Sequence, residues 1–483
     1  MSISSLNGAL GFATQFYSGS PASWRYTTGY AGTLEPAVQW HAATDIDFGA
    51  VQDERAAPQE VNSEMVPLGG YKGMAYVAGG ATINPRLESS AGVLLLNLLG
   101  YSTSGSAVNE ESLMAPTSLA AGSGSAAGTL VAAGLGNAKT LVATILTSGS
   151  ISAIGNTEAI TFNGGTSGSA AISLSSLKTS GATFKHIAAG GVAAAAITSI
   201  TLPQVTSTGN TRVSLGWYAA SAKEHTFSFD PSNKACIGWM TVRKLMPKPN
   251  CGVTGATFGE EGVDCRLANF RLNVPANGVV SARVDWQGRQ PQFYDNPSWT
   301  PSYETFNSVP ISCVLEGGIV IPAFSTNEMP ITNLSITMSN NTTQPQQEMV
   351  IGSYYPDDFV PMSRAMTITA TYKWADAAMY RAILTGQMTS PGDNTKYFWS
   401  PTPWYSPFWA RVAAPNTTVD GITKYSLTAF APNVMWSVAA PPALAGGDLV
   451  MLQLQGTVMK PLLATQNYCE LRLVNDTTAY TYA

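Results

Sequence analysis

Apolar and polar residues alternate strictly along residues 267–286, on both sides of an Asn-Gly pair. The apolar positions of the two runs are Ala268, Phe270, Leu272, Val274, Val280, Ala282, Val284 and Trp286. The polar positions between them are Asn269, Arg271, Asn273, Ser281, Arg283 and Asp285. Alternation with a period of two around Asn277-Gly278 predicts a long β-hairpin with one apolar and one polar face. Such a hairpin belongs to a sheet that has solvent, or a water-filled space, on one side.

A second pair of alternating runs follows further along the chain. Its apolar positions are Leu334, Ile336, Met338, Met366, Ile368, Ala370 and Tyr372. The second run finishes at Trp374, as the first hairpin finishes at Trp286, so we interpret the two hairpins as an internal repeat that is weak in identity. Two further strands are predicted near the C-terminus, at Leu449 to Val458 and Cys469 to Val474.

A loop from about Asn340 to Arg364 separates the two runs of the second hairpin. It is too long for a simple turn, and ordered loops of more than about 15 residues usually have a function. We predict that this loop contacts another subunit. Its candidate contact residues are Gln344, Met349, Tyr354, Tyr355, Asp357 and Asp358.

Two short helices are expected beside these strands. The first covers Ser89 to Leu99, a continuous apolar cluster that Gly100 ends. The second covers Ala375 to Leu384 and stops at Gly386. The inward residues of this second helix are predicted to be Met379, Tyr380 and Leu384.

The composition changes between about residue 103 and residue 213, where Gly, Ala, Ser and Thr dominate. Strands such as Leu141 to Leu146 and Ala171 to Leu174, joined by Gly-rich turns, are predicted there. We therefore predict a mainly β protein built from two tandem β-sandwich units with long hairpins and short flanking helices, plus an inserted small-residue β domain. The first unit comprises residues 1–102 and 214–300, the insert residues 103–213, and the second unit residues 301–483.

Charge argues against a nucleic-acid-binding protein. The 483 residues carry 25 Lys and Arg against 30 Asp and Glu, a formal net charge of −5. Duplex DNA binds proteins mainly through basic patches, which this balance does not provide. Charged residues are only 11% of the chain, well below the ~25% of ordinary soluble domains. This composition is typical of β-rich domains that bury surface against copies of themselves.

The five cysteines are Cys236, Cys251, Cys265, Cys313 and Cys469. Their number is odd and no CxxC pair occurs, so we interpret them as free thiols in a reducing compartment. Most are expected to be buried, with Cys265 as the exception. The N-terminus has no basic segment followed by a compact apolar run, which disfavours a signal peptide. The longest apolar run, around Ile187 to Ile200, is too rich in Ala and Gly to span a bilayer.

Signatures of catalysis are weak. The three histidines, His41, His186 and His225, have no metal-binding spacing. Residues 134–140 depart from a phosphate-binding loop because Ala138 precedes Lys139. Carboxylate pairs such as Asp45 and Asp47 have no third ligand or base nearby in sequence, so solvated loop charges are the simpler interpretation. We predict neither an enzyme nor a cofactor or metal site.

An aromatic group near residue 400 has two interpretations. Its members are Tyr397, Phe398, Trp399, Trp404, Tyr405, Phe408 and Trp409. Such a group is typical of a platform on which sugars stack. It is equally typical of a loop that packs against a neighbouring subunit, because Trp and Tyr are enriched at protein interfaces.

Several of these segments resemble tail tube proteins of long-tailed, siphovirus-like bacteriophages. The resemblance lies in the hairpin from Leu267 to Gly288, in the sequence NLSITMSNN at 333–341 with the strand 366–374, and in the helix 375–386. Residues 83–86, which run into the helix 89–100, are also similar. Together these motifs cover most of the chain outside residues 103–213.

The resemblance implies that the long hairpins of neighbouring subunits join into a closed barrel around a lumen, and that rings stack into a tube for ejected DNA. Two units in one chain imply a ring of three chains with pseudo-sixfold symmetry. The implied partners are other copies of the chain, a tape measure protein, and tail terminator or tip proteins. Genomic DNA is implied to pass through the lumen without specific binding. No membrane is implied as a partner. The implied location is the virion tail, after assembly in the host cytoplasm.

Two other functions remain open at this point. A capsid decoration or tail-tip subunit shares the composition but does not form tubes. A carbohydrate-binding adhesin is suggested by the aromatic group at 397–409 and by the Ser- and Thr-rich insert. Tube formation distinguishes the first alternative from a tail tube protein, and glycan binding by the monomer distinguishes the second. The polar face of the first hairpin is expected to line the lumen, and the loop 340–364 is expected to reach an adjacent ring.

Overall fold

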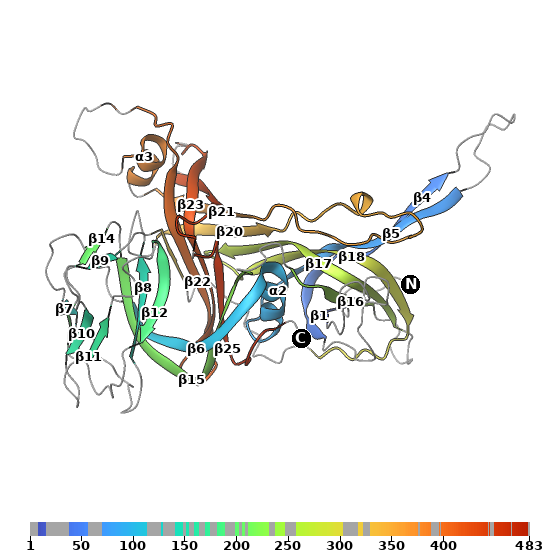
Figure 1. Ribbon diagram of the computed structural model, residues 1–483, viewed down its shortest axis with the longest axis horizontal. Coiled ribbons are helices and arrows are strands. Elements are labelled where there is room, and N and C mark those ends of the chain that lie inside the picture. The colour runs from blue at the N-terminus through green and yellow to red at the C-terminus, as the bar shows by residue number, and fades with distance from the viewer. Residues whose placement is uncertain are drawn as a thin grey trace.

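The computed structural model of the chain is mainly β, as the alternating pattern predicts (Figure 1). Antiparallel pairing joins most strands of the described part into one large sheet. The structure describes residues 8–15, 38–56, 70–113, 127–128, 141–147, 151–153, 159–163, 170–173, 181–188, 199–201, 205–207, 211–230, 237–246, 257–302, 317–321, 329–374, 377–387, 396, 398–442, 444, 449–464 and 466–481.

Eight neighbouring strands of this sheet, which we call the central sheet, lie in the order β4–β5–β18–β17–β20–β21–β24–β23. Their bounds are Gly49–Ala56 (β4), Gly70–Ile83 (β5), Ser281–Asp295 (β18), Phe258–Pro275 (β17), Ile331–Ser339 (β20), Ala365–Lys373 (β21), Met451–Val458 (β24) and Lys424–Ala440 (β23). A short strand, β3 (Ala43–Ile46), precedes β4 along the same edge of β5. The hairpin predicted at 267–286 is therefore formed by β17 and β18.

One face of the central sheet is apolar and buried. Strand pairing places one row of side chains across five strands: Ile83, Ala282, Leu272, Ile336 and Ile368. Each member of this row is at most 5% exposed. Removing such side chains from water is the main favourable contribution to folding. The alternation predicted for the first hairpin is confirmed, and it continues through the neighbouring strands.

Other strands cover this apolar face. Phe270, Leu272 and Ile336 of the central sheet face Ala410 and Leu471 across a small apolar gap. The strands of the covering layer include β1 (Ala9–Thr14), β2 (Gln39–His41), β16 (Met240–Met246), β19 (Gly317–Val320), β22 (Trp404–Thr418) and β25 (Glu470–Asn475). The predicted strands at 449–458 and 469–474 are confirmed as β24 and β25. The result is a sandwich whose interior is one continuous core.

Both α-helices end at a glycine in the left-handed conformation. Gly100 follows α2 (Ser90–Leu99) with φ 94°, and Gly386 follows α3 (Ala378–Thr385) with φ 73°. A side chain is strained at these angles, so glycine is the natural residue for the position after each helix. Both predicted helix ends are confirmed.

The inward face of α3 was predicted only in part. The buried residues of this helix are Met379, Ala382 and Ile383. Tyr380 and Leu384, which were predicted to point inward, are half-buried. Tyr380 packs against Trp374 with 5.5 Å between the ring centroids. The prediction was right for Met379, but Ile383 takes the place given to Leu384.

The region 103–213 is continuous with the rest of the protein through two long strands. β6 (Gly100–Leu113) pairs with β15 (Thr211–Phe229) along most of their length, so the predicted boundaries after 102 and 213 fall inside continuous strands. The strands predicted at 141–146 and 171–174 are present. The strands between β6 and β15 are β7 (Ala127–Gly128), β8 (Leu141–Thr147), β9 (Ile151–Ala153), β10 (Ala159–Asn163), β11 (Ala170–Ser173), β12 (Thr183–Ala188), β13 (Ser199–Thr201) and β14 (Val205–Ser207).

Cys265 is fully buried, which corrects the prediction that it is the exposed cysteine. It lies in the middle of β17 because that strand begins at Phe258, earlier than the alternating pattern indicated. Its Sγ fills the space beside Gly288, where an added Cβ would come within 2.4 Å. Burial raises the pKa of the Cys265 thiol well above its ordinary value. A thiol held in its protonated form in the core is unreactive.

Tyr480 attaches the C-terminal segment to the start of α2. Its hydroxyl donates to the carbonyl of Glu88 at 2.9 Å and accepts from Asn475 Nδ2 at 2.8 Å. We expect Tyr480→Phe to lower the free energy of unfolding by about 1–2 kcal/mol, because the Glu88 carbonyl and the Asn475 amide each lose one hydrogen bond. Urea denaturation measures the change. Tyr101→Phe, at a position that is 37% exposed, is the matched control, and a loss of equal size there would contradict the role of Tyr480.

Candidate functional site

The polar face of the central sheet contains all six predicted polar residues of the first hairpin. Asn269 and Arg271 are exposed, and the other four, Asn273, Ser281, Arg283 and Asp285, are half-buried. Pairing extends them into rows across seven strands, from β5 to β23. One row is Thr82, Arg283, Arg271, Thr337, Thr367 and Thr457. Another is Ser281, Asn273, Ser335, Thr369, Gln455 and Ser437. Hydroxyl and amide groups therefore dominate this wide face.

Arg283 lies among three carboxylates on the open part of this face. Arg283 donates from Nη2 to Asp47 at 2.7 Å and from Nε to Asp285 at 2.8 Å, and its Nη1 lies 3.5 Å from Asp45. Arg271 donates instead to Ser335 Oγ at 3.1 Å. Asp45 and Asp47, interpreted above as solvated charges, are thus partners of Arg283 on the edge of the sheet.

The position of Asp47 affects its ionisation. Burial opposes the charged form, but hydrogen bonds from Arg283 and from the Gly80 N–H, together with the Arg283 charge, lower the pKa of the Asp47 carboxyl below its ordinary value. We expect Arg283→Gln to raise this pKa toward the ordinary value near 4. A carbon-detected NMR titration of the Asp47 carboxyl measures the shift. Arg271→Gln is the matched control, because Arg271 has a hydroxyl partner rather than Asp47.

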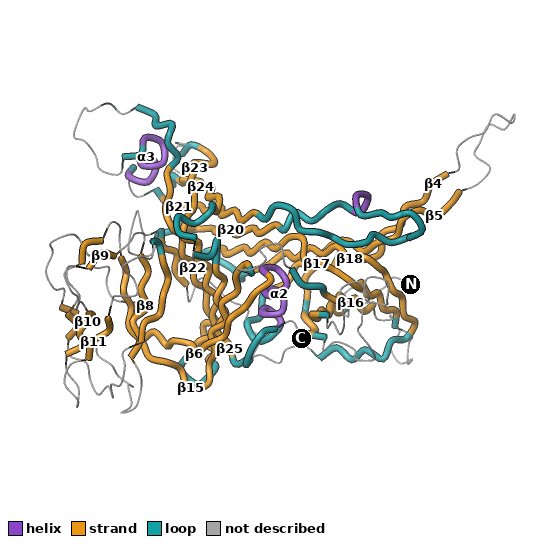
Figure 2. Tube along the Cα trace, in the orientation of Figure 1, coloured by secondary structure: helices purple, strands orange, loops and turns teal. Residues whose placement is uncertain are grey.

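The loop 340–364 lies across the first half of the chain (Figure 2). Thr342 Oγ1 donates to Gln287 Oε1 on β18 at 2.6 Å, and the amide of Ala75 on β5 donates to the carbonyl of Tyr354 at 2.9 Å. Near its ends, Asn340 Nδ2 donates to the carbonyl of Leu267, and Arg364 donates to the carbonyl of Leu98 at the end of α2. The loop therefore covers the part of the polar face that is formed by Gln287 on β18 and by the neighbouring part of β5.

A buried ion pair attaches this loop to the sheet. Arg266 Nε and Nη2 each donate to one oxygen of Asp358 at 3.0 Å. Arg266 also lies over the Trp239 ring, 4.0 Å from its centroid. Arg289 donates to the carbonyl of Pro356 at 2.9 Å. Two parallel hydrogen bonds between a guanidinium and a carboxylate fix both position and orientation.

The six predicted contact residues of the loop are not equally accessible. Gln344 and Tyr354 are exposed, and Met349, Tyr355 and Asp357 are half-buried. Asp358 is only 8% exposed and is paired with Arg266, so its carboxylate acts within the chain. The exposed apolar side chains of the loop are Val350, Ile351, Tyr354, Val360 and Met362. These residues had not been predicted, apart from Tyr354, and Ile351 is completely exposed.

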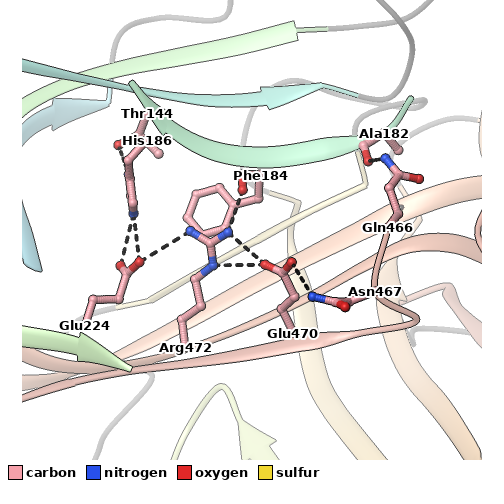
Figure 3. Close-up of polar contacts among 9 residues, drawn as sticks. All are labelled: Thr144, Ala182, Phe184, His186, Glu224, Gln466, Asn467, Glu470 and Arg472. Carbon is pink, nitrogen blue, oxygen red and sulfur yellow. Dashed lines mark hydrogen bonds and ion pairs between the residues drawn. The ribbon is translucent and has the colours of Figure 1, made fainter. Parts of the chain in front are cut away.

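A third polar group lies where the region 103–213 meets the C-terminal strands (Figure 3). His186 on β12 contacts both carboxylate oxygens of Glu224 on β15, at 3.0 and 3.1 Å. Arg472 on β25 contacts Glu224 at 3.4 Å and Glu470 at 2.8 Å, and donates to the carbonyl of Phe184. Burial alone would raise the pKa of Glu224, but His186 and Arg472 lower it to about 2. This network connects three strands that are distant in sequence.

The aromatic group near residue 400 is divided between surface and core. Phe398 and Trp399 are 83% and 73% exposed, whereas Phe408 and Trp409 are buried. Tyr405 is 45% exposed, Trp404 is half-buried, and Tyr397 lies outside the described residues. The six described residues therefore do not form one platform.

The described residues show neither a metal-binding cluster nor a membrane-spanning helix. Within them, no three His, Cys, Asp or Glu side chains are grouped so as to hold a metal ion. Among the same residues, no helix has both the length and the apolar character needed to cross a membrane. His41 and His225 are buried, and His225 lies between Ser104 and Asn475. Sequence comparison adds no identity: no model of a known protein family matches the chain, and no curated protein matches it significantly.

Proposed function

We propose that this chain is the subunit of a self-assembling tube, namely the tail tube of a long-tailed bacteriophage. The observation that carries the proposal is the central sheet. Its polar face extends over seven strands, while both of its edges have open pairing positions in the described part of the chain. Such edges favour association with further strands, and closure of a sheet into a cylinder removes them.

The two open edges are defined by the strand registers. At one edge, β3 and β4 pair only with β5 among the described strands. At the other, β23 pairs with β22 as far as Trp436, so Ser437–Ala440 have no pairing partner on that side in the part of the chain that the structure describes. The side chains of Val51 on β4 and Ser437 on β23 are both exposed. We infer that β3 and β4 of one copy pair with this end of β23 in the next.

An internal repeat within the chain supports this junction. The order β4–β5, α2, β17–β18 in the first half matches β20–β21, α3, β23–β24 in the second. When the strand registers are aligned so that Ile83 corresponds to Tyr372, Val51 corresponds to Ser339 and Ser437 to Asn269. Asn269 and Ser339 pair directly at the junction between the two halves. The junction between copies would therefore repeat the one already present inside the chain.

A ring of three chains follows from the repeat. Three copies would supply twenty-four strands from the eight of each central sheet. A closed sheet of that size, with ordinary strand spacing and tilt, is roughly 45 Å across between opposite backbones. This width admits duplex DNA. The Asn, Ser, Thr and Gln rows, with Arg283 held by aspartates, would line the lumen without binding phosphate strongly.

The remaining parts of the proposal concern the tube's contacts. The exposed apolar side chains of the loop 340–364 would bind an adjacent ring, since apolar patches of this kind mark interaction sites. A tape measure protein and tail terminator or tip proteins would be the other partners, in the virion and in the host cytoplasm during assembly. The function is structural, with no reaction catalysed.

Negative-stain electron microscopy of the purified chain, before and after concentration or warming, tests the proposal. Hollow tubes of stacked rings with three chains per ring are the expected result. Monomers that persist under all conditions would contradict it and favour a decoration subunit or an adhesin, with glycan binding to the exposed Phe398 and Trp399 as the next measurement.

A charge swap tests the ring junction itself. Val51→Lys with Ser437→Lys places like charges across the proposed junction, which destabilises paired strands. We expect this variant to need at least about tenfold more protein to assemble, whereas Val51→Lys with Ser437→Glu should assemble near the original concentration. Light scattering as a function of protein concentration measures the concentration at which each of the two variants assembles. Equal behaviour of the two variants would contradict the assigned edges.

A further inference from the structure

The hairpin β4–β5 extends beyond the body of the protein as an arm (Figure 1). β5 pairs with β18 only from Val77 to Ile83, so its first part, from Gly70, has β4 as its pairing partner among the described strands. Tyr71 on this arm is 53% exposed and Val51 is 37% exposed. Near its base the Ala75 amide donates to Tyr354 of the loop 340–364. A two-stranded ribbon with little further support is only marginally stable in water. The arm therefore has the character of a segment that packs on something else.

The proposed internal repeat indicates which surface the arm packs on. The loop 340–364 connects β20 to β21, and residues 57–69 connect β4 to β5 in sequence, so the two connections hold equivalent places in the order of elements. The loop lies across the first half of the chain, where Thr342 contacts Gln287 and Asp358 contacts Arg266. Under it, Arg289 of β18 is only 7% exposed.

The equivalent surface of the second half is less covered. The same alignment of strand registers matches Gln287 with Thr457 and Arg289 with Met459. Thr457 is half-buried, as Gln287 is, but Met459 is half-buried where Arg289 is buried, and Lys460 is exposed. The loop 340–364, which belongs to the second half, thus covers the first half. The end of β24 in the second half offers the equivalent surface for such a segment.

We propose that the arm of one copy lies across β24 and β23 of the next copy, as the loop 340–364 lies across β18 and β17 within the chain. This inference rests on the proposed ring of identical chains and adds a second contact to each junction. The matching of Thr342 with Glu54 places Glu54 of one copy beside Thr457 of the next. Each junction would then combine strand pairing with the contact made by the arm. This contact is head-to-tail, and it gives a closed ring when the rotations from copy to copy add up to a full turn.

Cysteine pairs and a short bis-maleimide cross-linker test the arm. One variant carries Glu54→Cys and a second carries Thr457→Cys, and the two are mixed during assembly so that only a bond between chains can form. Thr342→Cys with Gln287→Cys in one chain is the matched control, because these residues already touch. Unmodified protein with the same reagent gives the background from native cysteines. The expected result is a covalent dimer in the mixture and an internally linked monomer in the control.

A reference pair separates this inference from the proposed function. Val51→Cys and Ser437→Cys variants, mixed in the same way, report on the strand junction alone. If this pair gives dimers while Glu54→Cys with Thr457→Cys gives none, the ring stands and the placement of the arm is overturned. If neither pair gives dimers although the internal control is linked, the ring junction fails and the arm contact fails with it.

Discussion

Asp358→Ala is expected to release the loop 340–364 from the sheet beneath it. The substitution leaves the Arg266 guanidinium, which is 10% exposed, without its carboxylate partner. Breaking one side of a buried ion pair costs about 3–5 kcal/mol, because the remaining charge loses its compensation while it stays out of water. The hydrogen bond from Arg266 to Ile237 and the contact with Trp239 remain. The loss should therefore appear mainly in the free energy of opening the loop.

Hydrogen exchange measures this opening directly. The amide of Ala75 donates to Tyr354 of the loop, so its exchange should become at least about a hundredfold faster in the variant. Tyr354→Ala, at a side chain that is 68% exposed, should leave the exchange nearly unchanged. The double variant Arg266→Met with Asp358→Leu should recover much of the protection, since an apolar pair often replaces a buried ion pair without loss. Unchanged Ala75 exchange in Asp358→Ala would refute the anchoring role.

The parts of the fold that were predicted from sequence are those set by short-range patterns. The alternation at 267–286 determines which side chains of β17 and β18 face the core, because a change of register by one residue would expose the whole apolar row. Gly100 and Gly386 end their helices for a reason that is local to the backbone. The rows of Asn, Ser and Thr on the polar face follow from the same alternation.

The internal repeat that we propose differs from the one that the alternating pattern predicts. Trp286 and Trp374 each end an alternating run, which suggested that β17–β18 corresponds to β20–β21. In the proposed repeat the order of elements makes β4–β5 the counterpart of β20–β21, with a helix after each pair. The sequence of β3 and β4 does not alternate clearly, since Asp45, Asp47 and Phe48 interrupt the pattern at a bend in the edge strand. Only pairing with β5 and β18 reveals the match.

Contacts between distant segments were also beyond sequence reasoning. Asp358 was predicted to be available to another subunit, yet its partner Arg266 lies 92 positions earlier in the chain. Cys265 was predicted to be exposed because the start of β17 was placed too late. An adjacent pair such as Asp357 and Asp358 gave no signal of which carboxylate turns inward. These outcomes depend on tertiary geometry, which a hydrophobic pattern does not contain.

Arg472→Met is expected to disconnect the region 103–213 from the C-terminal strands. Arg472 is 8% exposed and contacts Glu224, Glu470 and the Phe184 carbonyl, with its guanidinium 4.1 Å from the Phe184 ring centroid. Its removal leaves Glu224 with His186 and the charge of Arg411 in a site where the side chain is 15% exposed. The expected loss is about 3–5 kcal/mol in the free energy of unfolding, because one side of a buried ion pair is removed. Arg472→Lys should lose less, because it keeps the charge but not the planar fork of donors.

The pH dependence distinguishes this loss from a simple packing defect. Burial raises the pKa of Glu224, and the contacts of His186 and Arg472 outweigh it to give a value of about 2. A depressed folded-state pKa contributes stability that is fully present above the ordinary value near 4.5 and is lost as the pH falls toward 2. In Arg472→Met the pKa of Glu224 should rise, so less of this acid-dependent stability remains to be lost below pH 4.5. Urea denaturation at pH 7 and pH 3 measures the difference, with Arg381→Met on α3 as the control outside the network. An equal loss at both pH values would show that Arg472 acts through packing alone, whereas a smaller effect of the substitution at pH 3 would identify Glu224 as the group it holds ionised.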